Sequence, residues 1–195
     1  MCSSDLTALD GGADPNAKNV VGYAPLHMAI ARGRVEAAQL LIARGADVNA
    51  RIQTVRPYYD YLPVARSLGN DLPQMDIRGV TPYLLAAASG DAGLMEFLAE
   101  HGADPKAVSS EGVNALMIAA GLGIEKGMTS EKDALEAARV ALRLGSDINA
   151  AKNDGRTALH GAAFLGWTEM MRFLAANGSN LEAKDMYGEI GRAHV

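Results

Sequence analysis

The sequence of 195 residues contains a single cysteine, Cys2, and no long uninterrupted apolar run. One cysteine excludes both an internal disulfide framework and a metal site built from several thiolates. No apolar stretch approaches the roughly 20 residues of a membrane-spanning helix, so we expect no membrane insertion by this chain.

Aromatic residues and positive charge are also scarce. Only 5% of the residues are aromatic, whereas small residues are abundant, with 21 glycines. Small side chains in place of aromatic ones favour closely packed helices over the core of a β-sandwich. The formal net charge of −5 gives no electrostatic basis for binding a phosphate backbone. We therefore expect no nucleic-acid partner.

What the sequence does contain is an internal repeat. Five similar phrases, GADPNA, GADVNA, GADPKA, GSDINA and GSNLEA, begin at Gly12, Gly45, Gly102, Gly145 and Gly178. Ten residues after four of them stands another glycine. A short apolar stretch such as RTALHGAAFLG follows, and then an amphipathic stretch such as WTEMMRFLAANG. Apolar residues at helical spacing in both stretches predict a pair of helices in each repeat.

The spacing of these second glycines defines the repeat length. The interval from Gly79 to Gly112 equals the interval from Gly155 to Gly188. This interval is about 33 residues, a length typical of repeats that stack into a solenoid. The intervals from Gly22 to Gly79 and from Gly112 to Gly155 are longer. They exceed the period by about 24 and about ten residues, which indicates two insertions in the array.

These motifs resemble the ankyrin repeat over Leu6 to Gly188. The sequences A-P-L-H at Ala24–His27, T-P-Y-L at Thr81–Leu84 and T-A-L-H at Thr157–His160 are similar to the Thr-Pro-Leu-His start of its first helix. The resemblance implies an all-α ankyrin-repeat solenoid over residues 7–188, with helix-turn-helix units and hairpin-like loops. We expect four complete units and partial units at both ends.

Local chemistry favours the same fold. Thr81 and Thr157 can accept an unpaired N–H at a helix start, and Pro25 and Pro82 fit the first helical turn. The glycine that opens each loop phrase suits the left-handed position after a helix. Since no single unit can bury its apolar face, stacked units are expected to form one continuous core.

The first insertion, at about residues 52–75, contains three of the six tyrosines. Tyrosine and arginine are enriched in binding hot spots. Its candidate partner-binding residues are Arg56, Tyr58, Tyr59, Tyr61 and Arg66. Alternatively, the tyrosines fold back over apolar repeat surface, and both hypotheses can hold together. We interpret the second insertion, at about residues 124–133, as mainly structural, because Ser130 and Asp133 fit a capping box.

The polar residues show no arrangement suited to catalysis, so we predict no catalytic residue, no cofactor and no metal ion. His27 and His160 occupy equivalent repeat positions, for which the resemblance implies structural hydrogen bonds. Four acids, Asp14, Asp47, Asp104 and Asp147, recur once in each repeat. A residue repeated with the fold period more often supports the fold than a single chemical step.

A row of positions at the loop tips and on the first-helix face is expected to point outward. The resemblance implies that partner proteins bind there. The candidates in this row are Tyr23, Arg32, Arg78, Val80, Val113, Arg156, Phe164, Leu165 and Tyr187. Many of them are apolar, and an exposed apolar stripe favours a partner site. The alternative is that neighbouring repeats or the tyrosine insertion cover this row.

The two ends of the chain do not fit the repeat. Cys2–Leu6 can be encoded by TGC-TCT-TCC-GAT-CT, whose reverse complement, read with one more base in front, encodes Glu189–Ala193. Two ends that share one inverted sequence resemble a translated sequencing-library adapter. We therefore expect residues 1–6 and 189–195 to be non-native, although a divergent capping segment is an alternative for the second. The absence of a signal sequence then excludes no compartment.

The sequence thus predicts a monomeric, non-catalytic module that binds an unidentified protein through loop tips, first-helix face and tyrosine insertion. An alternative is a regulatory or targeting domain of a larger enzyme or transporter. A third hypothesis is that the tyrosine insertion closes over a small ligand.

Overall fold

The computed structural model of the chain describes residues 12–19, 22–53, 77–122 and 129–188. Every regular element within these ranges is a helix. The helices are α2 (Pro25–Ala31), α3 (Val35–Ala43), α4 (Pro82–Ser89), α5 (Ala92–Glu100), α6 (Ala115–Ala119), α7 (Glu131–Arg143), α8 (Ala158–Leu165) and α9 (Thr168–Ala176). They form four consecutive pairs, units 1 to 4, so the predicted all-α solenoid with four complete units is confirmed.

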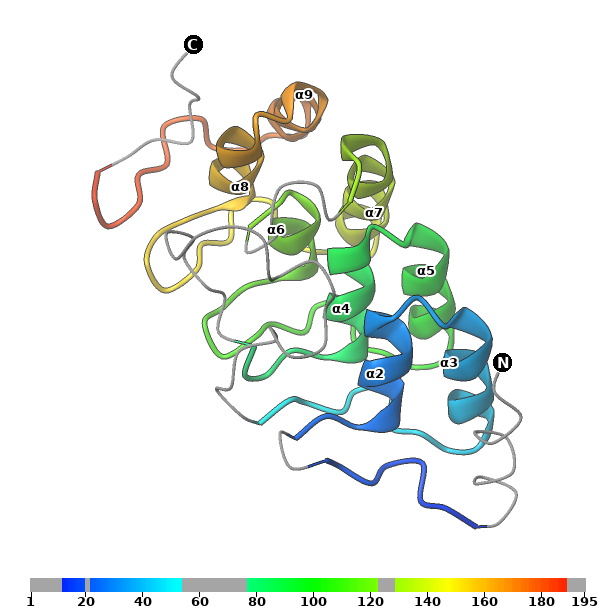
Figure 1. Ribbon diagram of the computed structural model, residues 1–195. Helices are drawn as coiled ribbons and strands as arrows, with labels where there is room; N and C mark the ends of the chain where they lie inside the picture. Colours follow the sequence, from blue (N-terminus) through cyan, green and yellow to red (C-terminus); the bar gives the residue numbers. More distant parts are fainter. Residues whose placement is uncertain (1–11, 20–21, 54–76, 123–128, 189–195) are drawn as a thin grey trace.

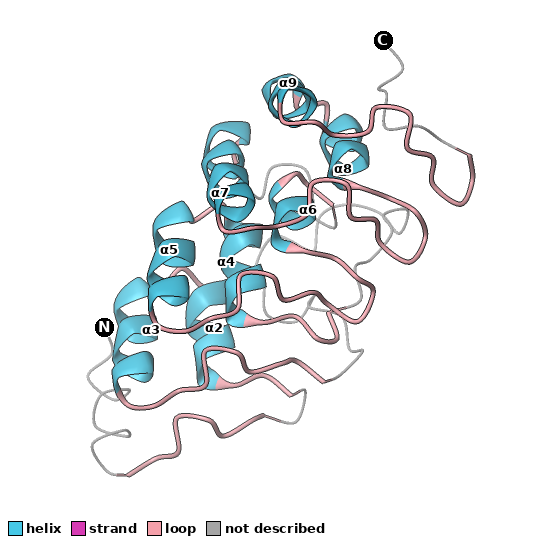
Figure 2. Ribbon diagram, turned by 180° about the vertical axis from the view of Figure 1, so that it is seen from behind, coloured by secondary structure: helices cyan, strands magenta, loops and turns pink. Residues whose placement is uncertain are grey.

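The four units are stacked in two layers of helices. The first helices, α2, α4, α6 and α8, form one row, and the second helices, α3, α5, α7 and α9, form the other (Figure 1). The connecting loops all extend from the same side of the helices, where they lie one above another (Figure 2). We call these stacked loops the fingers.

Polar side chains determine where several helices begin. Thr81 accepts a hydrogen bond from the N–H of Leu84 at the start of α4, as predicted. Asn114 accepts from the N–H of Met117 at the start of α6. Ser130 accepts from the N–H of Asp133 at the start of α7, which confirms the predicted cap. Each of these bonds satisfies a donor that lacks a partner within the helix.

Two helices use a histidine at the same place. His27 Nδ1 accepts from the N–H of Ala24 at 3.1 Å, and its Nε2 lies 3.0 Å from the Ala50 carbonyl oxygen. His160 Nδ1 accepts from the N–H of Thr157 at 3.2 Å. His27 therefore joins the start of a helix to the loop 23 residues farther along the chain. These contacts confirm the structural role that the resemblance implied.

Unit 3 departs from the other three. Its first helix, α6, has five residues, whereas α4 and α8 have eight. The chain turns away at Gly121, which has a left-handed φ of 97°. The backbone of unit 3 approaches α8 closely at Gly161. A Cβ atom at Gly161 would lie only 2.6 Å from the backbone nitrogen of Leu122. Units 3 and 4 are therefore joined by a backbone contact that no larger side chain allows.

The chain segments on either side of the first insertion are joined to each other by backbone hydrogen bonds. The N–H of Gly79 donates to Ile52, and the N–H of Ile52 donates to Val80, at 2.7 and 3.1 Å. The same pair of bonds links Ser109 with Gly112 and Val113, where it closes a tight turn with no insertion. The hydrogen-bonded ends at Ile52 and Gly79 thus flank the first insertion in the sequence. Ile52, expected at the start of the insertion, thus belongs to the repeat frame.

Asparagines connect consecutive loops through paired hydrogen bonds. Asn16 donates from Nδ2 to the Gly45 carbonyl at 3.1 Å and accepts at Oδ1 from the N–H of Asp47 at 2.7 Å. Asn49 makes the same two bonds, to Gly102 and Asp104. Asn149 makes them to Gly178 and Asn180. We call this paired contact the asparagine bridge.

Candidate functional site

The finger tips are held together by backbone hydrogen bonds. The N–H of Ser110 donates to the Arg78 carbonyl at 2.9 Å, that of Asn153 to Glu111 at 3.0 Å, and that of Met186 to Asp154 at 2.8 Å. Each bond joins one finger to the finger before it. The tips therefore form an ordered row rather than separate loops, and such a row presents its side chains with little entropic cost on binding.

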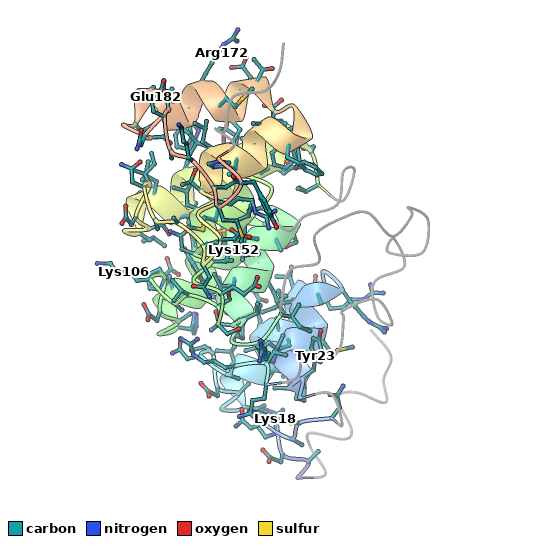
Figure 3. All side chains as sticks on the ribbon, turned by 90° about the vertical axis from the view of Figure 1, so that its left-hand side faces the viewer. Lys18, Tyr23, Lys106, Lys152, Arg172 and Glu182 are labelled. Carbon is teal, nitrogen blue, oxygen red and sulfur yellow. The ribbon has the colours of Figure 1, made fainter. Side chains whose placement is uncertain are left out.

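An ion-pair network strengthens the tips of units 3 and 4. Lys152 Nζ lies 3.0 Å from Glu111 Oε2 and 3.2 Å from Asp154 Oδ2. The Arg156 guanidinium binds the same Asp154 oxygen at 2.5 and 3.0 Å. Although burial raises the pKa of Asp154, hydrogen bonds from Arg156 and Lys152 together lower it to about 2. Figure 3 shows Lys152 centrally among the finger side chains.

Four of the nine predicted row residues are buried, so their expected exposure was wrong. Tyr23 is 3% exposed, Val80 and Val113 are both 0%, and Leu165 is 6%. Tyr23 packs edge-on against His27, with ring centroids 6.2 Å apart. Leu165 lies over Gly121, where even a Cβ atom would approach it to 2.4 Å. The alternative raised from the sequence, that the row is covered, therefore holds for these four residues, and for Leu165 the cover includes Gly121 of the neighbouring unit.

The other row residues remain accessible to different degrees. Phe164 is 64% exposed and Tyr187 is 76% exposed, and the adjacent Met186 is 67% exposed. Arg32 and Arg78 are also exposed, whereas Arg156 is half-buried and bound to Asp154. The candidates of the first insertion, Arg56, Tyr58, Tyr59, Tyr61 and Arg66, lie outside the described residues.

Phe164 is unusual for its place in the repeat. The equivalent positions of units 1, 2 and 3 are Ala31, Ala88 and Gly121. An aromatic ring therefore projects from the end of α8 where the other first helices carry almost no side chain. The aligned repeats already show in the sequence that a phenylalanine stands at this position only in unit 4. The sequence placed both Phe164 and Leu165 in the outward row, and the packing leaves Phe164 exposed but buries Leu165.

Stacked helix pairs, asparagine bridges and aligned fingers define a repeat solenoid. The ankyrin repeat family model matches the chain at residues 21–53 and 154–186. These two matches cover units 1 and 4, which carry His27 and His160, whereas units 2 and 3 carry Leu84 and Met117 there. The chain is an ankyrin repeat protein.

Curated relatives show the same similarity. The chain is 26% identical to neurogenic locus notch homolog protein 2 of Homo sapiens over 201 residues, which cover 94% of this chain and 7% of that protein. It is 30% identical to ankyrin repeat protein nuc-2 of Neurospora crassa over 108 residues, 50% of this chain and 10% of that protein.

A third relative is the transient receptor potential cation channel subfamily A member 1 homolog of Caenorhabditis elegans. Identity to it is 26% over 175 residues, which cover 85% of this chain and 14% of that protein. The chain thus spans a small part of the length of each of these relatives. Among the residues that the structure describes, no helix has the length and apolarity needed to cross a membrane.

Proposed function

We propose that this chain is a non-catalytic module that binds a partner protein through Phe164 and the exposed finger tips, including Arg78 and Tyr187. The observation that carries the proposal is the 64% exposure of Phe164 at a repeat position that holds alanine or glycine in the other three units. Ankyrin repeats generally mediate protein–protein contacts, which supports the same function.

The mechanism is the insertion of aromatic anchors into a partner by a rigid support. Phe164 and Tyr187 supply apolar area at low conformational cost, because aromatic side chains have few rotatable bonds. Arg32 and Arg78 supply a polar rim, where water-exposed contacts adjust specificity more than affinity. Since the fingers are already paired, binding requires little rearrangement of this chain.

A photo-crosslinking amino acid at position 164 tests this proposal directly. Placed at position 172 on α9, the same probe serves as a control, because Arg172 is also exposed but belongs to the second row of helices. We expect one protein to be captured at position 164 and not at position 172. With that protein purified, Phe164→Ala should weaken binding by about 30-fold, the effect of a hot-spot residue worth roughly 2 kcal/mol.

Equal capture at both positions, or equal affinity of Phe164→Ala and Arg172→Ala, would contradict the proposed surface. The residues of the first insertion remain a separate prediction. If Tyr58, Tyr59 and Tyr61 contact the same partner, replacing all three by alanine should weaken binding without changing the crosslink at position 164.

The alternative function is a regulatory or targeting domain within a larger protein. The observation that favours it is the small share of each relative that this chain spans, one of them being named as a cation channel. Sequencing the source DNA beyond both ends distinguishes the two. An open reading frame into a catalytic or channel domain supports the alternative, and only further repeats support the simple binding module.

A further inference from the structure

The asparagine bridge is a repeated, well-defined contact between a carboxamide and two backbone groups. In three places the Nδ2 group donates to a glycine carbonyl at 2.8–3.1 Å. In the same three places the Oδ1 atom accepts, at 2.7–2.8 Å, from the N–H two residues after that glycine. The loop backbone that receives each bridge is therefore a bidentate site for one primary carboxamide.

A fourth loop offers the same glycine carbonyl and the same N–H group, but no asparagine stands opposite them. Lys106 stands where Asn16, Asn49 and Asn149 stand in the other loops, opposite Gly145 and Asp147. Lysine has donors but no acceptor, so its ammonium cannot accept the N–H of Asp147. Within the described ranges, neither the Gly145 carbonyl nor the Asp147 N–H has a protein hydrogen-bond partner.

The backbone around this place keeps the conformation of the occupied bridges. The N–H of Lys106 donates to Asp104 Oδ1 at 2.9 Å, as the N–H of Asn49 donates to Asp47 and that of Asn149 to Asp147. On the receiving side, Asn114 Nδ2 donates to the Asp147 carbonyl at 2.9 Å. The two unbridged groups are therefore held in place from within the protein.

We propose that the Gly145 carbonyl and the Asp147 N–H form a binding site for a primary carboxamide, the asparagine or glutamine side chain of a partner protein. The inference rests on the proposed function, because the partner supplies this side chain. The site adds a second contact, in the loop that follows α7, and this contact fixes the position of the partner along the stacked units.

The chemistry of the site selects a carboxamide over other groups. The site requires one donor and one acceptor at fixed spacing, and a carboxylate cannot donate to the Gly145 carbonyl. The exposed side chains of Asp104 and Asp147 also disfavour an anion. The Lys106 stem lies against Gly145, and the side chain is exposed at the edge of the molecule (Figure 3). A ligand thus displaces a solvated side chain rather than a buried one.

Amide-resolved NMR with acetamide as the probe tests the site without any partner. We expect the Asp147 amide resonance to shift several-fold farther than those of Asp47, Asp104 and Asn180, whose N–H groups are already bridged. N,N-dimethylacetamide, which lacks the donor, should produce no selective shift. Lys106→Asn should abolish the response by filling the site, and Lys106→Ala should increase it by uncovering Gly145.

Equal shifts at all four amides, or an unchanged response in Lys106→Asn, would show that only water occupies this place. A second arm compares capped tripeptides with asparagine or aspartate at the centre. A selective shift with the asparagine peptide supports a protein side chain as the ligand, whereas a response to acetamide alone overturns that assignment. Failure of the site leaves crosslinking at position 164 unaffected, so the two proposals fail separately.

Discussion

Acid sensitivity at His27 follows from its two hydrogen bonds. The ring is fully buried, and burial lowers its pKa from 6.5 to about 4, although the hydrogen bond to the Ala50 carbonyl acts in the opposite direction. Nδ1 accepts from Ala24, so the neutral ring carries its hydrogen on Nε2 and donates to Ala50. Protonation of Nδ1 removes that acceptor and places a charge in the core.

The direction of the pH effect comes from the two pKa values. Below pH 6.5 the unfolded chain binds a proton at His27, whereas the folded chain binds one only near pH 4. Stability therefore falls as the pH falls through this window and is fully present above it. The difference between these two pKa values, at about 1.4 kcal/mol for each pKa unit, corresponds to roughly 3.5 kcal/mol in the free energy of unfolding over the full titration, most of it between the two values.

The perturbation is His27→Leu, because leucine stands at the equivalent position of unit 2 as Leu84. Urea unfolding followed by far-UV circular dichroism gives the free energy of both proteins between pH 6.5 and about pH 4. At the upper end the variant should be less stable, since the Ala24 N–H and the Ala50 carbonyl lose their partner. The advantage of the wild type should shrink by about 3 kcal/mol toward the lower end. A difference that stays constant with pH would refute this reasoning, because all other titrating groups are common to both proteins.

Two further predictions concern stability at neutral pH. The Ser146 hydroxyl is buried without a hydrogen-bond partner among the described residues, so Ser146→Ala should raise the free energy of unfolding by about 1 kcal/mol. Ser109→Ala is the matched control and should lower it by a similar amount, because Ser109 Oγ accepts from two backbone N–H groups. Glu131 Oε1 accepts from the first turn of α9, at 2.7 and 3.1 Å, so Glu131→Ala should cost about 1 kcal/mol. Glu136→Ala, which breaks only an exposed pair with Arg139, should change stability by less than about 0.5 kcal/mol. Urea unfolding measures all four variants, and an equal loss for Glu131→Ala and Glu136→Ala would contradict the cap between units.

The repeat frame allowed several features to be predicted residue by residue. Thr81 and Ser130 begin helices because their side-chain oxygens suit that place whatever the surroundings. Loop glycines such as Gly145 adopt left-handed φ angles, 97° in this case, which a side chain at Cβ disfavours. These are local preferences of the chain, so one sequence was enough to identify them.

Exposure was harder to predict for the candidate site. Val80, Val113 and Phe164 all belong to the predicted outward row, yet the two valines are buried and the phenylalanine is exposed. A repeat frame assigns each residue a direction relative to its own unit. Whether a neighbouring unit covers that direction depends on the contacts between units.

The sequence by itself determined the period, the helix pairs and the resemblance to the ankyrin repeat, because all of these are written in local residue order. Only the tertiary structure decided that Glu131 caps a helix of the next unit, that asparagines bridge consecutive loops, and that no other described residue bridges Gly145 and Asp147. It also decided which residues of the predicted row remain accessible. Each of these depends on how close two units approach, and residues far apart in the chain set that distance together.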